Sequence, residues 1–306
     1  MNKKMEDILK QLSDRVWVIQ AATNTGIIKL NGRECLAVDP GGDRDNAKYL
    51  LRTLERLGLE LAVVLITHAH ADHYGACAYL KKNTGSQFFA SPFESSLIEQ
   101  PILEPIFLYG GAEPIKELTH KFILAKPVAI SARLEAGDWE CRGNTFKIIN
   151  LPGHSTGQIG LVCDDLLFSG DALMLGDYIR KFKFPFYSNI TTALQSLNQI
   201  LNSDYRMLIP GHGSLLEPDA YRRESDFAIR NLNELIEIAI AELGSEPLTV
   251  EKLLQRMARK LETPMVTPIQ YVLDRTLVLA IINFLYTNGR VEHFFQDSLW
   301  LWKIKS

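Results

Sequence analysis

Five of the seven histidines in the chain fall in three short motifs, and each motif directly follows an apolar run. The motifs are His68-Ala-His70-Ala-Asp72-His73, Gly153-His154 and Gly211-His212. A further acidic residue, Asp171, follows the apolar run 166–168. Short apolar runs that end in Gly, Pro or Asp are typical of buried strands, so we expect these polar groups at strand ends. Strands of this kind separated by helical segments predict an α/β fold.

The remaining patterns divide the chain into two parts. The predicted strands cover 36–39, 61–67, 86–90, 146–151, 166–168 and 207–210, and the predicted helices cover 47–57, 74–82 and 191–201. Residues 1–15 also have helix spacing. Later candidates are helices at 227–243, 250–261 and 268–286 and a hairpin at 290–305. We therefore expect an α/β catalytic domain over 1–220, with an insertion at about 91–133, and a smaller, mainly helical C-terminal domain over 221–306.

Two helices followed by a hairpin have the outline of a winged helix, which makes nucleic acid a partner to consider. Basic and acidic residues are balanced from residue 221 to the end, which disfavours a basic nucleic-acid face. We favour a helical cap over the site or a dimerisation arm, so a homodimer is a possible assembly. The insertion at 91–133 is either a lid beside the site or a packed surface excursion.

Composition narrows the class of protein. The net charge is −3 and the pI about 6.2, which supply no long-range attraction to nucleic acid or to an anionic membrane. The first residues lack an apolar signal core, and we identify no apolar run of the ~18 residues that a membrane span requires. The four cysteines form no CxxC pair. We expect a reduced, cytoplasmic protein that does not bind membranes.

The residue types in the motifs favour a metal site. On an extended segment, residues two apart point the same way, so His68 and His70 can reach one ion. Asp72 and His73 come after a turn and can face a second ion. Neutral imidazole and carboxylate suit zinc, iron or manganese, whereas the absence of cysteine from the motifs argues against a closed structural zinc site.

With Asp39 in Val38-Asp39-Pro40-Gly41, the motifs resemble in order the five motifs of the metallo-β-lactamase superfamily, over about residues 16–216. The resemblance implies an αββα sandwich with two divalent metal ions, zinc preferred over iron or manganese. It also assigns the ligands: His68, His70 and His154 for metal 1, Asp72, His73 and His212 for metal 2, and Asp171 as the bridge. By the same resemblance, Asp39 accepts a hydrogen bond from a ligand imidazole.

Departures from the family's branches narrow the substrate. True β-lactamases of the superfamily place Cys, Ser or another residue where Asp171 stands, so antibiotic hydrolysis is disfavoured. The segment 172–183 lacks the Gly-Cys-Gly-Arg of glyoxalase II, so lactoylglutathione is disfavoured as well. Three nearby residues are candidates for substrate binding, although core packing for the two tyrosines and a solvated charge run for the arginine are equally ordinary: Tyr74, Tyr178 and Arg180.

The predicted reaction is hydrolysis of a small-molecule ester, thioester or lactone. Two cations about 3.5–4 Å apart can hold a bridging water, lower its pKa and direct the hydroxide at a carbonyl. Asp72 and His73 are the candidate catalytic residues, because Asp72 can also accept the proton of that water. Two alternatives stay open: a phosphodiesterase or endoribonuclease acting on RNA, and a regulatory metal-binding protein without enzymatic activity.

Overall fold

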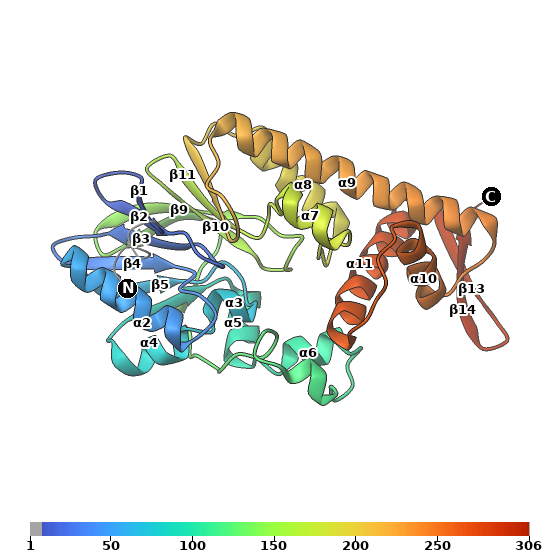
Figure 1. Ribbon diagram of the computed structural model, residues 1–306, viewed down its shortest axis with the longest axis horizontal. Coiled ribbons are helices and arrows are strands. Elements are labelled where there is room, and N and C mark those ends of the chain that lie inside the picture. The colour runs from blue at the N-terminus through green and yellow to red at the C-terminus, as the bar shows by residue number, and fades with distance from the viewer. Residues whose placement is uncertain (1–7, 306) are drawn as a thin grey trace.

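Two β-sheets lie face to face in the N-terminal part of the molecule (Figure 1). The computed structural model describes residues 8–305. The first sheet has the order β1 (Leu9–Gln11), β2 (Val16–Ile19), β3 (Thr25–Lys29), β4 (Glu34–Val38), β5 (Glu60–Leu65), β6 (Gln87–Ala90) and β7 (Ala132–Arg133). The second has the order β12 (Met207–Pro210), β11 (Leu166–Gly170), β10 (Ile159–Cys163), β9 (Asn144–Asn150) and β8 (Gly137–Cys141).

The central strands β2–β5 of the first sheet are buried on both faces, as β4 illustrates. Leu36 and Val38 pack into the core between the two sheets, whereas Cys35 and Ala37 pack against the helices outside. Side chains alternate between the two faces of a strand, so a strand that is apolar throughout needs cover on both sides. The cover on this sheet comes from α2 (Arg44–Leu57) and α4 (Cys77–Asn83).

The outer face of the second sheet is covered by α8 (Ile190–Leu201), with the short α7 (Gly176–Phe182) beside it. Helices therefore lie outside both sheets, and the predicted αββα sandwich is confirmed (Figure 1). All four cysteines are buried and free in this core, as their scattered positions indicated.

The long helix α9 (Pro218–Ser245) runs from the sandwich into the C-terminal region (Figure 1). There it meets α10 (Val250–Lys260), α11 (Pro268–Thr287) and the hairpin β13 (Val291–Gln296) and β14 (Leu299–Ile304). Leu248 pairs with Trp302 as an isolated bridge beside the hairpin. The helices and hairpin follow the predicted order, and their interpretation as a winged helix stays a prediction. So does the domain boundary at residue 220, because α9 crosses it.

The insertion forms α5 (Pro92–Glu99), α6 (Leu103–Leu108) and the short 3-10 helix η1 (Lys116–Thr119) before β7. It reaches α11 through a small apolar cluster of Leu118, Ile123 and Val272. The C-terminal region therefore contacts the sandwich through α9 and α11, which pack against α8, and it contacts the insertion through α11 (Figure 1).

By length and composition, α11 is the one helix in the described part of the chain that could cross a membrane. Its side chains Leu277, Val278 and Ile281 lie in the same buried cluster as the core of α8 and α9. A core helix meets the same test of length and hydropathy, so α11 is weak evidence for a membrane segment.

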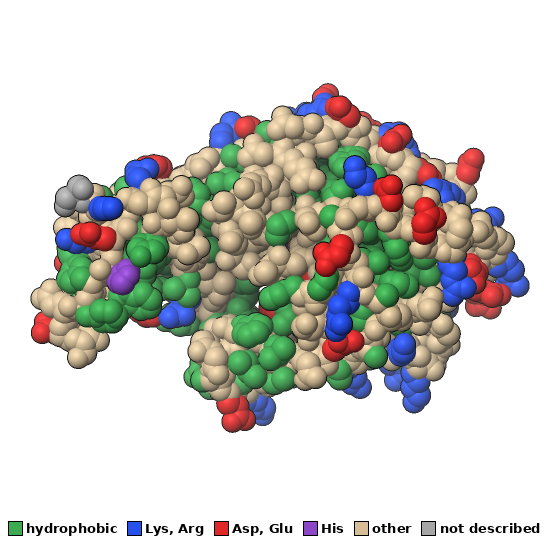
Figure 2. All heavy atoms as spheres, turned by 180° about the vertical axis from the view of Figure 1, so that it is seen from behind, with side chains coloured by type: hydrophobic (Ala, Val, Ile, Leu, Met, Phe, Trp, Pro, Cys, Tyr) green, Lys and Arg blue, Asp and Glu red, His purple; other side chains and the backbone are tan. Residues whose placement is uncertain are grey.

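On the face shown in Figure 2, lysine and arginine side chains are interspersed with acidic ones.

Three local predictions were wrong. The helix expected over 74–82 is divided into α3 (Ala71–Tyr74) and α4, because the Ala76 N–H donates to the Gly41 carbonyl at 2.9 Å instead of to the carbonyl four residues earlier. Helix α9 begins nine residues before the expected residue 227, at a proline in the first turn, where proline is favoured. The helix spacing over 1–15 fails at Leu9–Gln11, which pairs with β2, and residues 1–7 lie outside the described part.

Candidate metal centre

The predicted ligands lie where the sequence places them, beyond the ends of four strands. His68 and His70 follow β5, and α3 carries Asp72 and His73. Three further groups follow strands of the second sheet: His154 after β9, Asp171 after β11 and His212 after β12. Figure 1 shows α3 at the edge of the sandwich nearest the C-terminal region. The structure brings all seven side chains together at this edge.

Three histidines form the first group of donors. The His68 Nε2 atom lies 3.1 Å from His70 Nδ1, and His154 Nε2 lies 2.8 Å from the same His70 atom. All three donor atoms lie within 4.8 Å of one another. His68 and His154 are buried, and the His70 side chain is 22% exposed. A single cation can therefore contact three imidazoles here.

A second group lies beside the first and contains a carboxylate. His212 Nε2 lies 3.2 Å from Asp72 Oδ2 and 3.3 Å from His73 Nε2. His73 is fully buried, whereas the side chains of Asp72 and His212 are 41% and 36% exposed. This group thus combines a negative charge with a path to solvent.

Asp171 lies between the two groups. Its Oδ1 atom is 3.5 Å from His73 Nε2, and its Oδ2 atom is 3.3 Å from His212 Nε2 and 3.6 Å from His154 Nε2. A side chain at Gly211 would clash with this carboxylate, which explains the glycine in that motif. The Asp171 carboxylate thus approaches imidazole nitrogens of both groups, as a bridging residue must.

The outer ring nitrogens of the histidines are held by acceptors. His154 Nδ1 donates to the Phe186 carbonyl at 2.9 Å, and His212 Nδ1 donates to the Ala22 carbonyl at 2.5 Å. A carbonyl oxygen only accepts, so the outer nitrogen carries the proton and the inner nitrogen presents a lone pair. This tautomer is the one that metal-binding histidines use.

Asp39 links one histidine of each group. It accepts from His73 Nδ1 at 3.0 Å and from the Thr67 hydroxyl at 2.7 Å. Because that hydroxyl donates to Asp39, it accepts from His68 Nδ1, 3.1 Å away. The backbone of Asp39 has a φ of +49°, in the left-handed region that few residues other than glycine adopt. The predicted contact between Asp39 and a ligand imidazole is present in the structure.

The two groups have opposite electrostatics. Burial lowers the pKa of His68 and His70, and it lowers the pKa of His154 to about 3. Burial opposes protonation of His73 and His212 as well, but Asp171 and Asp72 raise their pKa values to about 10 and about 12. The first group is therefore neutral. The second group favours a positive charge beside Asp72 and Asp171, which either a proton on its histidines or a divalent cation in the proton's place supplies. This donor set fits two divalent cations.

The three candidate substrate residues occupy different settings. Tyr74 is 2% exposed and packs in the core under α2. Tyr178 is partly exposed, and burial followed by the charges of Asp171 and Asp72 raises its pKa to about 12. Arg180 pairs with Asp177 at 2.7 Å and lies over the Phe227 ring. Of the three, Tyr178 is thus the one whose hydroxyl is influenced by the carboxylates of the site.

Sequence reasoning missed two carboxylates of the insertion, Glu94 and Glu104. Glu104 Oε1 lies 3.6 Å from His70 Nε2, and burial raises its pKa to about 7. Glu94 is fully buried and contacts the loops that carry the histidines. Neither residue belongs to a motif. The one available signal is at Glu104, an acidic residue in the otherwise apolar stretch 103–108.

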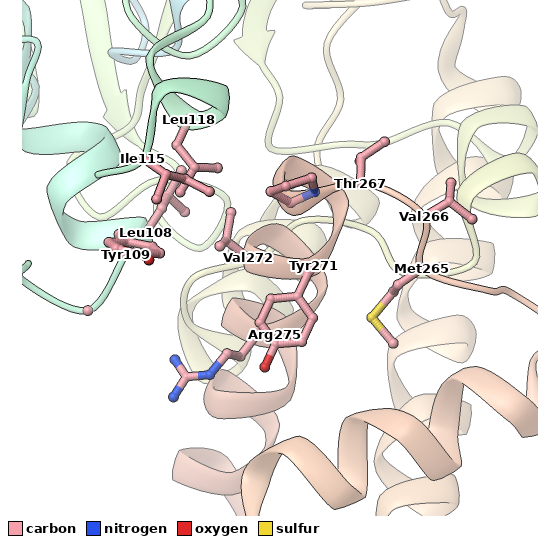
Figure 3. A pocket seen from close by; sticks show the side chains of 12 residues that line it. Leu108, Tyr109, Ile115, Leu118, Met265, Val266, Thr267, Tyr271, Val272 and Arg275 are labelled. Carbon is pink, nitrogen blue, oxygen red and sulfur yellow. The ribbon is translucent and has the colours of Figure 1, made fainter. Parts of the chain in front are cut away.

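An apolar groove of about 530 Å³ lies between the insertion and α11 (Figure 3). Its lining includes Leu108, Ile115, Val272 and Tyr271, with Arg275 at one side. None of the seven predicted ligands lines it. The groove is connected to the site through α6, because Leu108 follows Glu104 by four residues on the same helix face, about 6 Å along the axis.

A family model described as the metallo-beta-lactamase superfamily matches residues 19–212. A hydroxyacylglutathione hydrolase named GloC from Haemophilus influenzae is 28% identical over 67% of this chain and 92% of its own length. A hydroxyacylglutathione hydrolase from Vibrio cholerae is 33% identical over 58% of this chain. The match spans 55% of the Vibrio protein, so about half of that relative's length is represented.

Two solved structures resemble nearly the whole chain. A metallo-beta-lactamase family protein from Thermus thermophilus has a TM-score of 0.73 at 19% identity, over 96% of this chain and all of its own. A beta-lactamase domain protein from Burkholderia ambifaria has a TM-score of 0.74 at 17% identity, over 97% and 93% of the two chains. At these identities the likeness concerns the fold, and it extends into the C-terminal region.

Proposed function

Because the chain belongs to the metallo-beta-lactamase superfamily, we propose that it is a binuclear metal-dependent hydrolase of a small ester, thioester or lactone. The observation that carries the proposal is the position of Asp171 between two groups of three donors. His68, His70 and His154 would hold one divalent ion, and Asp72, His73 and His212 the other. Zinc suits this set of imidazoles and carboxylates best, with iron or manganese as alternatives.

Two such ions, when bound, lower the pKa of a water molecule toward neutrality and so supply hydroxide at pH 7. The chain itself provides a proton acceptor in Asp72. Burial favours its neutral form, but His73 and His212 hold the pKa of Asp72 below its usual range. Asp72 is therefore ionised at neutral pH, as a metal ligand and as a proton acceptor must be, and the low pKa makes it a weak base toward the attacking water.

Thioesters are the substrate class with the most support. The Haemophilus and Vibrio relatives are named hydroxyacylglutathione hydrolases, and an acylglutathione is a thioester. The segment 172–183 departs from the glyoxalase II pattern, so we propose a thioester other than lactoylglutathione. Substrate contacts of Tyr74, Tyr178 and Arg180, the cytoplasmic location and a homodimer stay predictions.

The groove beside α6 supports a small molecule with an apolar part. Among the described residues that line it, Arg275 is the one cation, and Arg275 pairs with Glu251 at 3.2 Å. A surface that binds RNA needs several unpaired cations along its length. The groove therefore gives no support to RNA as the substrate.

The test is hydrolysis of a substrate panel by purified protein loaded with zinc, manganese or iron. The panel contains acyl thioesters, lactones, an activated phosphodiester and short RNA, with Asp72→Asn as the inactive control. We expect thioester or lactone turnover that is lost in the control. Turnover of RNA alone would replace the proposal with a nuclease, and two bound metals without any turnover would favour a regulatory protein.

A further inference from the structure

One buried carboxylate of the insertion contacts both loops that carry the histidines of the first donor group. Glu94 Oε2 accepts from the backbone N–H of Ala69 at 2.8 Å, and Ala69 lies between His68 and His70. Glu94 Oε1 accepts from the Ser155 hydroxyl at 2.5 Å and the Gly157 N–H at 2.8 Å. Ser155 directly follows His154. One side chain thus connects two segments that are far apart in the sequence.

The need to fill space in the core does not explain why residue 94 is a glutamate. Glu94 is 0% exposed, and taking a carboxylate out of water costs several kcal/mol unless hydrogen bonds replace the lost solvation. Burial raises the pKa of Glu94, while its three donors act in the opposite direction. An apolar residue would fill the same volume without this cost. The carboxylate is therefore best explained by the three groups that it holds.

The position of Glu94 in α5 also favours its charge. Pro92 begins the helix, the Ser91 hydroxyl accepts from the Glu94 N–H, and Glu94 lies in the first turn. The amino-terminal end of a helix carries a partial positive charge, which stabilises a carboxylate there. The helix start thus fixes the side chain that holds the two loops.

We propose that Glu94 is a positioning residue that sets the spacing between the His68–His70 loop and the His154 loop, and thereby the affinity for the first metal ion. The spacing in question is the 2.8 Å between His70 Nδ1 and His154 Nε2. Among the contacts described for Glu94, none involves Asp72, His73 or His212. The inference rests on the proposed metal centre and concerns one of its two halves.

The test is a metal titration of the full chain against a chelator of known affinity, comparing Glu94→Gln with the unchanged protein. Gln has the same size but places an N–H donor against one of the three donors. We expect the affinity of one of the two ions to fall by about 10–100-fold, the range typical of residues that orient metal ligands. The affinity of the other ion should stay unchanged. The absorption spectrum of the cobalt-loaded protein should change at one site only.

Glu99→Gln is the matched control on the same helix. Glu99 pairs with Arg133 at 3.2 Å and accepts from the Ile130 N–H, on the side of the insertion away from the loops. It should leave both affinities unchanged. Should Glu94→Gln fail to fold, Ser155→Ala removes one of the three hydrogen bonds and should weaken the same ion by a smaller factor.

The outcomes separate the inference from the proposed function. An unchanged protein that binds no divalent ion would contradict the metal centre itself. Two ions bound with normal affinity in both Glu94→Gln and Ser155→Ala would overturn the positioning role alone. A loss of thermal stability in these variants without any change in metal affinity would likewise overturn it, since a purely structural contact predicts that result.

Discussion

The edge of the sandwich that holds the candidate metal site and helix α11 each bury a carboxylate. The two carboxylates differ in the hydrogen bonds that they accept. Asp39 at the edge is 2% exposed, and its oxygens accept three hydrogen bonds from Thr67 and His73. Asp274 in α11 is 6% exposed, and its Oδ2 atom has no hydrogen-bond partner in the described part of the chain. Burial raises the pKa of Asp274 to about 7. Three donors thus surround the Asp39 carboxylate, whereas one oxygen of Asp274 has no donor in the described part of the chain.

The comparison predicts the largest loss of activity for a substitution of Asp171, which lies between the two donor groups. In Asp171→Asn the side chain keeps its size but loses the charge that lies near three imidazoles. We expect kcat/KM to fall by more than ~100-fold, beyond the range for residues that only orient ligands, and at least one bound ion to be lost. Steady-state kinetics and metal content after dialysis measure both. Two retained ions with activity within tenfold would show that the charge at Asp171 is dispensable.

The Asp39→Asn variant tests whether the hydrogen bonds that Asp39 accepts matter as much as the charge of Asp171, the candidate metal ligand. An amide cannot accept from all three donors, so His68 and His73 lose part of their orientation. We expect metal affinity to drop about 10–100-fold. Asp43→Asn makes the same chemical change at the N-cap of α2, where Asn caps equally well, and should have no effect. Equal affinities in the two variants would remove Asp39 from the site.

Asp274→Asn tests the α11 side of the comparison through pH. The pKa of Asp274 rises from its ordinary 3.8 to about 7 on folding, so the folded state holds the proton longer. Below pH 3.8, Asp274 does not lower the wild-type free energy of unfolding. As the pH rises from 3.8 to 7, that free energy falls because the folded state keeps the proton, and above pH 7 it stays at the lower value. A neutral Asn removes this loss.

We expect Asp274→Asn to gain ~3 kcal/mol relative to wild type between pH 4.5 and pH 8, out of ~4 kcal/mol for the full pKa change. Urea unfolding of both proteins at the two pH values measures the difference, in which any pH-independent cost of the amide cancels. A variant whose stability relative to wild type is the same at both pH values would mean that Asp274 titrates normally.

Arg180→Ala should have the smallest effect. The Arg180 side chain is 57% exposed, and its guanidinium already contacts Asp177 and the Phe227 ring. Exposed ion pairs contribute little to stability or binding. We expect KM to change less than about threefold, by the same factor for a neutral thioester and for one that carries a carboxylate. A selective rise in KM for the carboxylate substrate would instead support Arg180 as a substrate-binding residue.

The positions of the metal-site residues could be predicted from the sequence because they follow buried strands, and strand ends meet at one edge of a sandwich. The hydrogen bond between Asp39 and His73 was expected from the family resemblance and is present. Glu94 and Glu104 could not be found in this way. Their roles depend on where the insertion folds back, and no local pattern records the distance from Glu94 to Ala69.

Contacts between distant segments also explain the local errors. The helix is interrupted after Tyr74 because the Ala76 N–H bonds to Gly41 in a distant loop, and Gly75 lets that loop come close because it has no side chain. Helix propensity contains no information about that loop. The sequence pattern at Tyr74 was compatible with a pocket wall or with core, and the covering helix α2 buries it. Proline is common at the first position of a helix, so Pro218 indicates the start of α9, whereas the hydrophobic pattern alone predicted a later start.

The second sheet and the C-terminal helices share one hydrophobic core, which limits where the protein can be truncated. Leu167 of β11, Leu197 of α8, Leu232 of α9 and Leu277 of α11 belong to one buried cluster. Sequence similarity to the family ends at residue 212, before α9 begins. An expression fragment designed on that similarity would expose the apolar side of α8 and aggregate. A productive boundary for truncation or domain exchange therefore has to retain α9 and the partners that cover it.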